Sequence, residues 1–172
     1  RHAYAESPDY VPLVGRADDL WRELEAETGE SVFVRCGGLE MAAPGHPHAR
    51  AARRSADDHG LPYEWMTPAE GRARWPQIAI PEDWDVFFDP RAGFVRTVPA
   101  LRGMMSLAMR TGVELHENEP ALAWGVEAGS VWVRTAVDLY RAERLIVAAG
   151  AWAQGALSDL GLPLRVRRKT LW

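Results

Sequence analysis

The sequence lacks several features by which whole classes of protein are recognised. Its one cysteine, Cys36, excludes an intrachain disulfide and a thiolate metal cluster, and a chain so poor in cysteine fits a reducing cytoplasm. Its longest apolar run, Leu145 to Ala153, is much shorter than the ~20 residues that cross a bilayer. The formal net charge of -4 gives no general attraction to nucleic acid or to an anionic membrane. We therefore expect a cytoplasmic protein with neither kind of partner.

The glycine-rich motifs of nucleotide-binding proteins are also missing. Neither G-x-G-x-x-G nor G-x-x-x-x-G-K-[ST] occurs in the chain. The chain opens on Arg1-His2-Ala3-Tyr4-Ala5 without an initiator methionine. We interpret it as an internal piece of a longer polypeptide, which would hold part of an active site.

Neither the histidines nor the basic residues form a convincing site. His46 and His48 make an H-x-H pair, and His116 lies near two glutamates, but metal sites need three or four convergent ligands. The basic run at 165–169 alternates as a solvated strand face would, and no aromatic stacking pattern accompanies it. We therefore expect no metal and no bound nucleic acid.

The composition is that of an ordinary globular protein. Hydrophobic residues make up 47% of the 172 positions and charged residues 26%, which argues against disorder. The length suffices for one domain, or for one domain plus a fragment of a second.

The sequence predicts five helices. Apolar residues recur on one face of 13–27, before Gly29, and Thr67-Pro68-Ala69-Glu70 is a capping box that starts a helix ending near Trp75. The other predicted helices are 49–59, one capped by Thr97 and closed by Gly112, and an alanine-rich one at 151–160 that ends at Gly161.

Short strands are predicted between these helices. Alternation or apolar runs indicate strands at 32–35, 39–41, 61–66, 86–88, 113–117, 121–127, 131–135, 139–142 and 145–147. The last one, Leu145-Ile146-Val147, is apolar at every position, as in a strand covered on both faces. The fold class is therefore α/β with a mixed sheet. The expected parts are 1–95, 96–162 and the start of a strand at 163–172.

The strand, turn and helix at 145–160 could carry chemistry. Gly150 permits a tight turn and close backbone approach, and a helix start favours an anion. Spacing alone leaves contact with a cofactor and ordinary packing of strand on helix both open.

Three stretches resemble one family of flavoenzymes. They are RLIVAAGAWAQGALSDLGLPLRVRRK near the end, the opening RHAYAESPDYVPL, and ARWPQIAIPEDWDVFFDPRAGFV between them. All are similar to the glycine/D-amino-acid oxidase-like flavoproteins, and within them to the monomeric sarcosine oxidase and N-methyl-tryptophan oxidase group. The similarity runs in order through essentially all 172 residues.

The resemblance implies the central fragment of a two-domain FAD-dependent amine oxidase. Residues 1–95 would belong to its substrate-binding domain and residues 96–162 to its FAD-binding domain, with a truncated strand from 163 to 172. The N-terminal Rossmann βαβ unit and the C-terminal half would be missing portions of its own chain. Cys36 lies in the wrong region to be the cysteine that bonds to the flavin. The fragment alone is expected not to bind FAD tightly and to be inactive.

The resemblance also implies site residues. Arg1 would help to hold the substrate carboxylate, with Tyr4 and Tyr10 lining the pocket and its mobile loop. Ala5 stands where relatives commonly have glycine, which would stiffen this loop. The residues matching cofactor contacts are Ala121, Ala148, Ala149, Gly150 and Trp152. A solvated terminus for Arg1, rim packing for the tyrosines and core filling for Trp152 remain open.

The activity that the resemblance implies is oxidation of a secondary amine. A hydride equivalent would pass from the C–N unit of an N-methyl amino acid to flavin N5, the imine would hydrolyse, and oxygen would be reduced to hydrogen peroxide. Two alternatives stay open: a non-catalytic binding domain, and a related flavin-dependent amino acid dehydrogenase that passes electrons to another acceptor.

Overall fold

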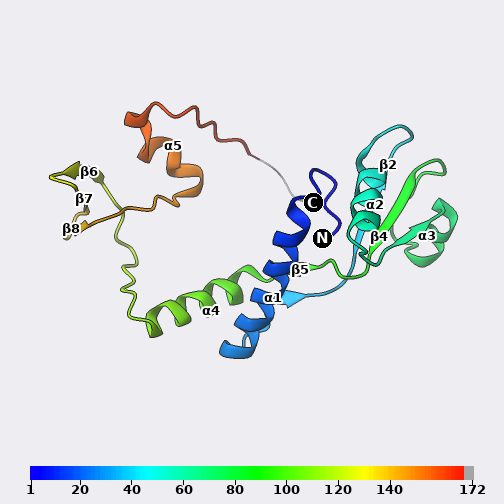
Figure 1. The fold of residues 1–172 in the computed structure, drawn as a ribbon, viewed down its shortest axis with the longest axis horizontal. Helices are drawn as coiled ribbons and strands as arrows, with labels where there is room; N and C mark the ends of the chain where they lie inside the picture. The colour runs from blue at the N-terminus through cyan, green and yellow to red at the C-terminus, as the bar shows by residue number, and fades with distance from the viewer. Residues whose placement is uncertain (169–172) are drawn as a thin grey trace. The chain divides into compact units, whose positions relative to one another are not determined.

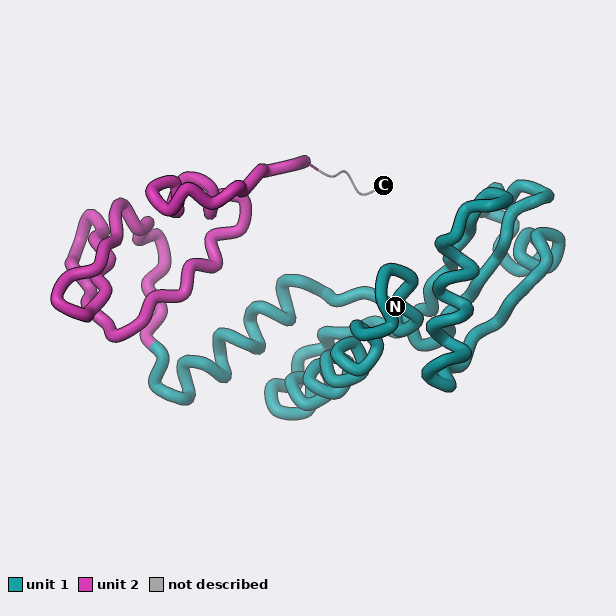
Figure 2. Tube along the Cα trace, turned by 45° about the horizontal axis from the view of Figure 1, so that its top comes forward, with its two compact units in different colours: residues 1–113 teal, residues 114–172 magenta. Residues whose placement is uncertain are grey.

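The chain folds into two compact units, which are described separately (Figures 1 and 2). The computed structural model describes residues 1–168. Unit 1 comprises residues 1–113 and unit 2 comprises residues 114–172. No helix in the part of the chain described has the length and apolar character needed to cross a membrane.

One half of unit 1 is a three-stranded antiparallel sheet under a helix. The sheet has the order β2 (Gly38–Ala42), β4 (Asp85–Asp89), β3 (Glu64–Met66). Helix α2 (His48–Asp58) covers it with a face of small residues, because alanines let the helix approach closely. Phe87 is fully buried there and stacks on Tyr63. The buried members of this core are Ala3, Ala42, Ala49, Ala52, Ala56 and Phe87.

The other half of unit 1 is a pair of helices beside a short ribbon. Helix α1 (Tyr10–Thr28) packs on α4 (Thr97–Arg110), and β1 (Phe33–Val34) pairs antiparallel with β5 (Phe94–Val95). The core residues are Leu24, Val32 and Ala100. Because α4 packs on α1, the compact units divide after residue 113, whereas the predicted parts divide at 95/96.

The helix ends test the predicted caps. Gly29 closes α1 in the left-handed conformation, with φ of 73°, and Thr67 and Glu70 form the predicted capping box of α3 (Pro68–Arg74). The predicted cap at Thr97 is wrong. Thr97 is already the first helical residue, Arg96 holds the cap position, and no side chain caps the helix there.

Unit 2 contains an antiparallel meander of three strands: β6 (Ala123–Glu127), β7 (Ser130–Arg134) and β8 (Leu139–Ala142). Ala128 and Gly129, with φ of 49° and 78°, form the tight turn between the first two. The predicted strands at 121–127, 131–135 and 139–142 are thereby confirmed to within two residues. The one predicted at 113–117 does not form.

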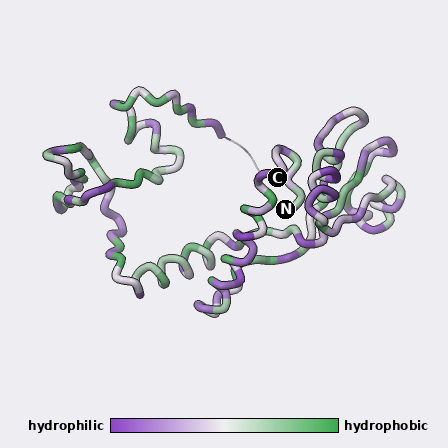
Figure 3. The backbone as a smooth tube through the Cα atoms, viewed as in Figure 1, coloured by the Kyte–Doolittle hydropathy of each residue, from purple (hydrophilic) through white to green (hydrophobic). Residues whose placement is uncertain are grey.

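The segment after β8 departs from prediction. Leu145-Ile146-Val147 is not a strand: none of the described strands pairs with it, and the Ile146 side chain is 89% exposed. An isolated extended segment has no ladder to stabilise it, although the stretch is strongly apolar (Figure 3). The predicted helix 151–160 is broken into η1 (Gly150–Trp152), α5 (Ala153–Ala156) and η2 (Ser158–Leu160). Its predicted end at Gly161 is confirmed by a left-handed cap.

The fold class is confirmed as a mixture of helices and sheets. Every strand pairing among the described residues is antiparallel. The predicted strand at 163–172 does not form over 163–168. Its remainder, 169–172, lies outside the described residues.

Candidate substrate and cofactor sites

The N-terminal segment brings the three predicted substrate-binding residues together. The Arg1 guanidinium carbon lies over the Tyr4 ring, 4.8 Å from its centroid. The Tyr4 and Tyr10 rings are 4.9 Å apart between centroids, at an interplanar angle of 35°. A cation over an aromatic face is attracted by the ring quadrupole, so these side chains form one group. Their role in binding substrate stays a prediction.

The backbone of this segment is held by residues beside Arg1. Ala3 is buried in the core under α2, and the His2 N–H donates to Asp89 Oδ2 at 2.8 Å. Asp89 is itself buried at the end of β4. The sheet thus fixes the backbone positions of Arg1 and Tyr4, and contacts of their side chains determine how these side chains are oriented.

Arg1 is surrounded by charged and polar groups. Its Nη2 donates to Glu6 Oε1 at 2.5 Å, and its Nη1 lies 3.5 Å from Glu40 Oε1 and 3.3 Å from His48 Nε2. Burial opposes the charge, but the Glu6 hydrogen bond and both carboxylates raise the pKa of Arg1 above its ordinary value. The hydrogen bond from Arg1 in turn lowers the pKa of Glu6.

A cleft of about 360 Å³ adjoins this group within unit 1. Arg1, His2, Tyr4 and Asp18 line its polar part, and Trp21 and Phe33 belong to its apolar part. Tyr10 does not line the cleft and meets it only through Tyr4. A pocket with a few convergent polar groups on apolar walls is typical of small-molecule sites.

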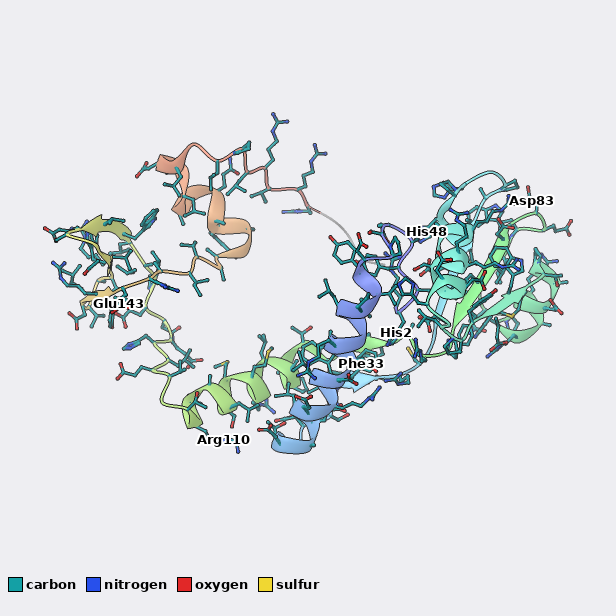
Figure 4. The ribbon with its side chains drawn as sticks, in the orientation of Figure 1. His2, Phe33, His48, Asp83, Arg110 and Glu143 are labelled. Atoms are coloured by element: carbon teal, nitrogen blue, oxygen red, sulfur yellow. The ribbon has the colours of Figure 1, made fainter. Side chains whose placement is uncertain are left out.

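A buried polar cluster forms one wall of this cleft. Asp18 of α1 accepts hydrogen bonds from Arg35 Nη2 at 2.8 and 3.0 Å and from Arg22. Burial would raise the pKa of Asp18, but the Arg35 hydrogen bond and the two arginine charges outweigh it and lower the pKa. The buried His2 ring, labelled in Figure 4, lies 3.8 Å from both Asp18 Oδ2 and Asp89 Oδ2. Burial, followed by the Arg91 charge, lowers the pKa of His2.

The predicted cofactor residues all lie in unit 2. Ala121 is exposed just before β6, and Ala148, Ala149, Gly150 and Trp152 follow one another between β8 and α5. The Trp152 side chain is 80% exposed in the part of the chain that the structure describes. Gly150 has φ of 54°, and a Cβ there would meet nothing within 4 Å. Small, open, apolar positions of this kind fit the close approach of a large planar group.

The predicted helix start at Gly150 is not a strong anion site. Helix α5 has four residues, too few for aligned peptide dipoles to sum as they do in a long helix. Contact with a cofactor would therefore depend on the exposed backbone and the small side chains of this segment.

Sequence reasoning missed three residues of the unit 1 site. His2 and Asp18 were overlooked because nothing in one sequence shows that a polar side chain is buried. Glu40 carried a weak signal, since it is a charged residue between Leu39 and Met41 in a predicted strand. A charge in an apolar strand interior is expected to have a partner when it is buried.

The fold and these two sites together define a class of protein. A flavin-dependent oxidoreductase needs a cleft for its substrate and a surface for its cofactor. Unit 1 has a cleft with arginine and tyrosine, and unit 2 has an exposed apolar segment of mostly small residues. The chain matches the DAO family of FAD-dependent oxidoreductases over residues 1–172. It belongs to that family, whose cofactor is FAD.

Curated relatives and a solved structure agree with this assignment. The chain is 35% identical to a monomeric sarcosine oxidase from Streptomyces avermitilis, covering all of this chain and 45% of that protein. It is 32% identical to an N-methyl-L-tryptophan oxidase from Yersinia pestis (strain Pestoides F), covering 93% of this chain and 43% of that one. The chain therefore spans less than half the length of these relatives.

The fold is similar to that of a variant of NikD, an unusual amino acid oxidase essential for nikkomycin biosynthesis. The TM-score is 0.80 at 24% identity, and the match covers 94% of this chain and 42% of NikD. At this identity the likeness concerns the fold alone.

Proposed function

We propose that the protein containing this chain oxidises the secondary amine of an N-methyl amino acid, such as sarcosine or N-methyl-tryptophan, with FAD as its cofactor. The observation that carries the proposal is the grouping of Arg1, Tyr4 and Tyr10 beside a cleft. The likeness to two oxidases of N-methyl amino acids supports the same substrate class.

In this proposal Arg1 holds the substrate carboxylate. A charge-assisted hydrogen bond contributes roughly 1.5–3 kcal/mol, and a guanidinium can make two to one carboxylate. Tyr4 lines the cleft beside the bound amino acid, and Tyr10 supports the Tyr4 ring from outside the cleft. Ala121, Ala148, Ala149 and Gly150 would hold the cofactor through backbone and small side chains, and Trp152 would offer it an exposed ring.

Bound FAD would supply a two-electron acceptor for the C–N unit of the substrate, and molecular oxygen would take up the two electrons together with two protons to give hydrogen peroxide. The imine product then adds water and splits into an amine and an aldehyde. The residues of this chain bind and orient the substrate for that transfer.

The test uses the full-length protein supplied with sarcosine and with N-methyl-tryptophan under air. Peroxide formation together with the visible absorption of bound flavin is expected. The Arg1→Gln variant should raise KM roughly 10-fold or more, because it removes the charge that meets the carboxylate. Arg16→Gln is the matched control, since Arg16 is exposed on α1 and pairs only with Glu23 at 2.7 Å among the described contacts.

The outcome also separates the alternatives. Substrate-dependent reduction of an artificial electron acceptor without peroxide would indicate a dehydrogenase. A full-length protein with no flavin absorption would contradict the proposal and favour a binding domain.

A further inference from the structure

Glu40 is a buried carboxylate next to the Arg1 guanidinium. It lies in β2, its side chain is 12% exposed, and its Oε1 is 3.5 Å from Arg1 Nη1. Its Oε2 is 2.8 Å from Nε2 of His48, which Figure 4 labels at the start of α2. Neither oxygen accepts a hydrogen bond of favourable geometry. A buried charge so poorly satisfied is costly, so Glu40 depends on the Arg1 charge beside it.

The two carboxylates near Arg1 differ in how strongly water screens them. The Glu6 side chain is 54% exposed and the Glu40 side chain 12%. Solvent weakens the field of an exposed charge much more than that of a buried one. Glu40 therefore reduces the positive potential that Arg1 creates in the adjoining cleft. Glu6 reduces this potential less.

We propose that Glu40 is a specificity-determining residue: its charge restricts the Arg1 site to ligands with one uncompensated carboxylate at most, such as amino-acid zwitterions, and disfavours dianions. The inference rests on the proposed role of Arg1 as the carboxylate-binding residue. A single carboxylate can still share the Arg1 hydrogen-bond donors. A second negative charge on the ligand is repelled by Glu40.

Equilibrium binding of two simple anions to the full-length protein tests this without any turnover. Acetate carries one carboxylate and malonate carries two, and isothermal titration calorimetry gives the Kd of each. Wild type should bind acetate more tightly than malonate. In Glu40→Gln, which keeps the side-chain shape and removes the charge, the malonate Kd should fall relative to the acetate Kd by roughly tenfold.

The ratio of the two Kd values separates specificity from positioning. Loss of Arg1 orientation weakens both anions together and leaves the ratio unchanged, whereas loss of a repelling charge changes it. Glu64→Gln is the matched control, because it removes a glutamate from strand β3 of the same sheet, and the ion-pair partner of Glu64 is Arg74. This control should keep the wild-type ratio.

The outcomes distinguish the inference from the proposed function. If Arg1→Gln weakens both anions but Glu40→Gln leaves the ratio unchanged, the inference is wrong and the Arg1 site stands. If Arg1→Gln changes neither Kd, or if no variant binds either anion, the carboxylate site is wrong and the inference with it. Should Glu40→Gln not fold, the wild-type preference decides, and tighter binding of malonate than of acetate overturns the inference.

Discussion

The two units bury their apolar side chains to very different extents. All of the buried hydrophobic residues in the described chain lie in unit 1, between Ala3 and Ala100. In the described part of unit 2, by contrast, Val137 is 79% exposed and Ile146 89%. Unit 1 closes cores of its own, while unit 2 forms local hydrogen-bonded structure without one. Residues close together in the sequence are therefore enough to form a hairpin, but a buried strand also needs neighbours from elsewhere in the fold.

Unit 2 is organised by a polar network at one end of its meander. Glu119 accepts hydrogen bonds from Thr135 Oγ1 at 2.5 Å and from the Tyr140 hydroxyl at 2.9 Å, and His116 lies 3.2 Å from it. The Glu119 hydrogen bond raises the pKa of Tyr140 to about 12. Polar contacts of this kind fix geometry locally and bury little apolar surface.

The largest effect is expected from emptying the unit 1 core. Phe87→Ala removes a fully buried ring that stacks on Tyr63 and should lower the free energy of unfolding by about 3–5 kcal/mol. Denaturant unfolding followed by circular dichroism measures it. Phe94→Ala is the control, since Phe94 is 55% exposed and should change stability by less than about 1 kcal/mol. Equal losses in the two variants would contradict the assignment of this core.

Two glycines, one in each unit, compare the space available for a side chain. Gly93 lies in a crowded place in unit 1, and Gly150 lies in an open one in unit 2. A Cβ at Gly93 would lie 2.1 Å from the Val34 carbonyl oxygen, so Gly93→Ala should cost about 1–3 kcal/mol or more. Gly150→Ala meets no neighbour within 4 Å and carries only the strain of its positive φ, about 1–2 kcal/mol. Thermal unfolding of both variants tests the order. A larger loss at Gly150 would contradict the open surroundings of this turn.

The capping box gives a smaller effect within unit 1. Thr67→Ala removes the hydroxyl that accepts from the Glu70 N–H and should destabilise the protein by about 1 kcal/mol. Thr97→Ala removes a threonine that caps nothing, so its effect should stay within about 0.5 kcal/mol. The midpoint of denaturant unfolding distinguishes the two, and a reversed order would mean that Thr97 is the stronger cap.

The smallest effect concerns pH. Burial lowers the pKa of His2 in the folded protein below the ordinary 6.5, so the unfolded chain binds this proton more readily. Stability should therefore be complete above about 6.5 and decline as the pH falls from there through the folded value. Comparing pH-dependent unfolding of wild type and His2→Gln isolates this contribution. An unchanged pH slope would contradict the direction of the shift.

The sequence predicted most of the local structure. The capping box at Thr67, the left-handed cap at Gly29 and the turn at Ala128-Gly129 were each recognisable, because every one depends on residues within four positions of it. The strand predicted at 145–147 did not form, because a strand needs a neighbour that its own residues do not specify. For the candidate site, the resemblance pointed to Arg1, Tyr4 and Tyr10. The surroundings of Arg1 were not predicted, since Glu40 and His48 reach it across 39 and 47 positions.

By itself the sequence determined the family, the caps at Gly29 and Thr67 and the absence of glycine-rich nucleotide motifs, because these depend on residue identity and short spacing. Only the tertiary structure decided which charges are buried. It placed Glu40 next to Arg1, and it placed His2 between the carboxylates of Asp18 and Asp89. The lower dielectric constant of these buried places strengthens the electric field of each charge.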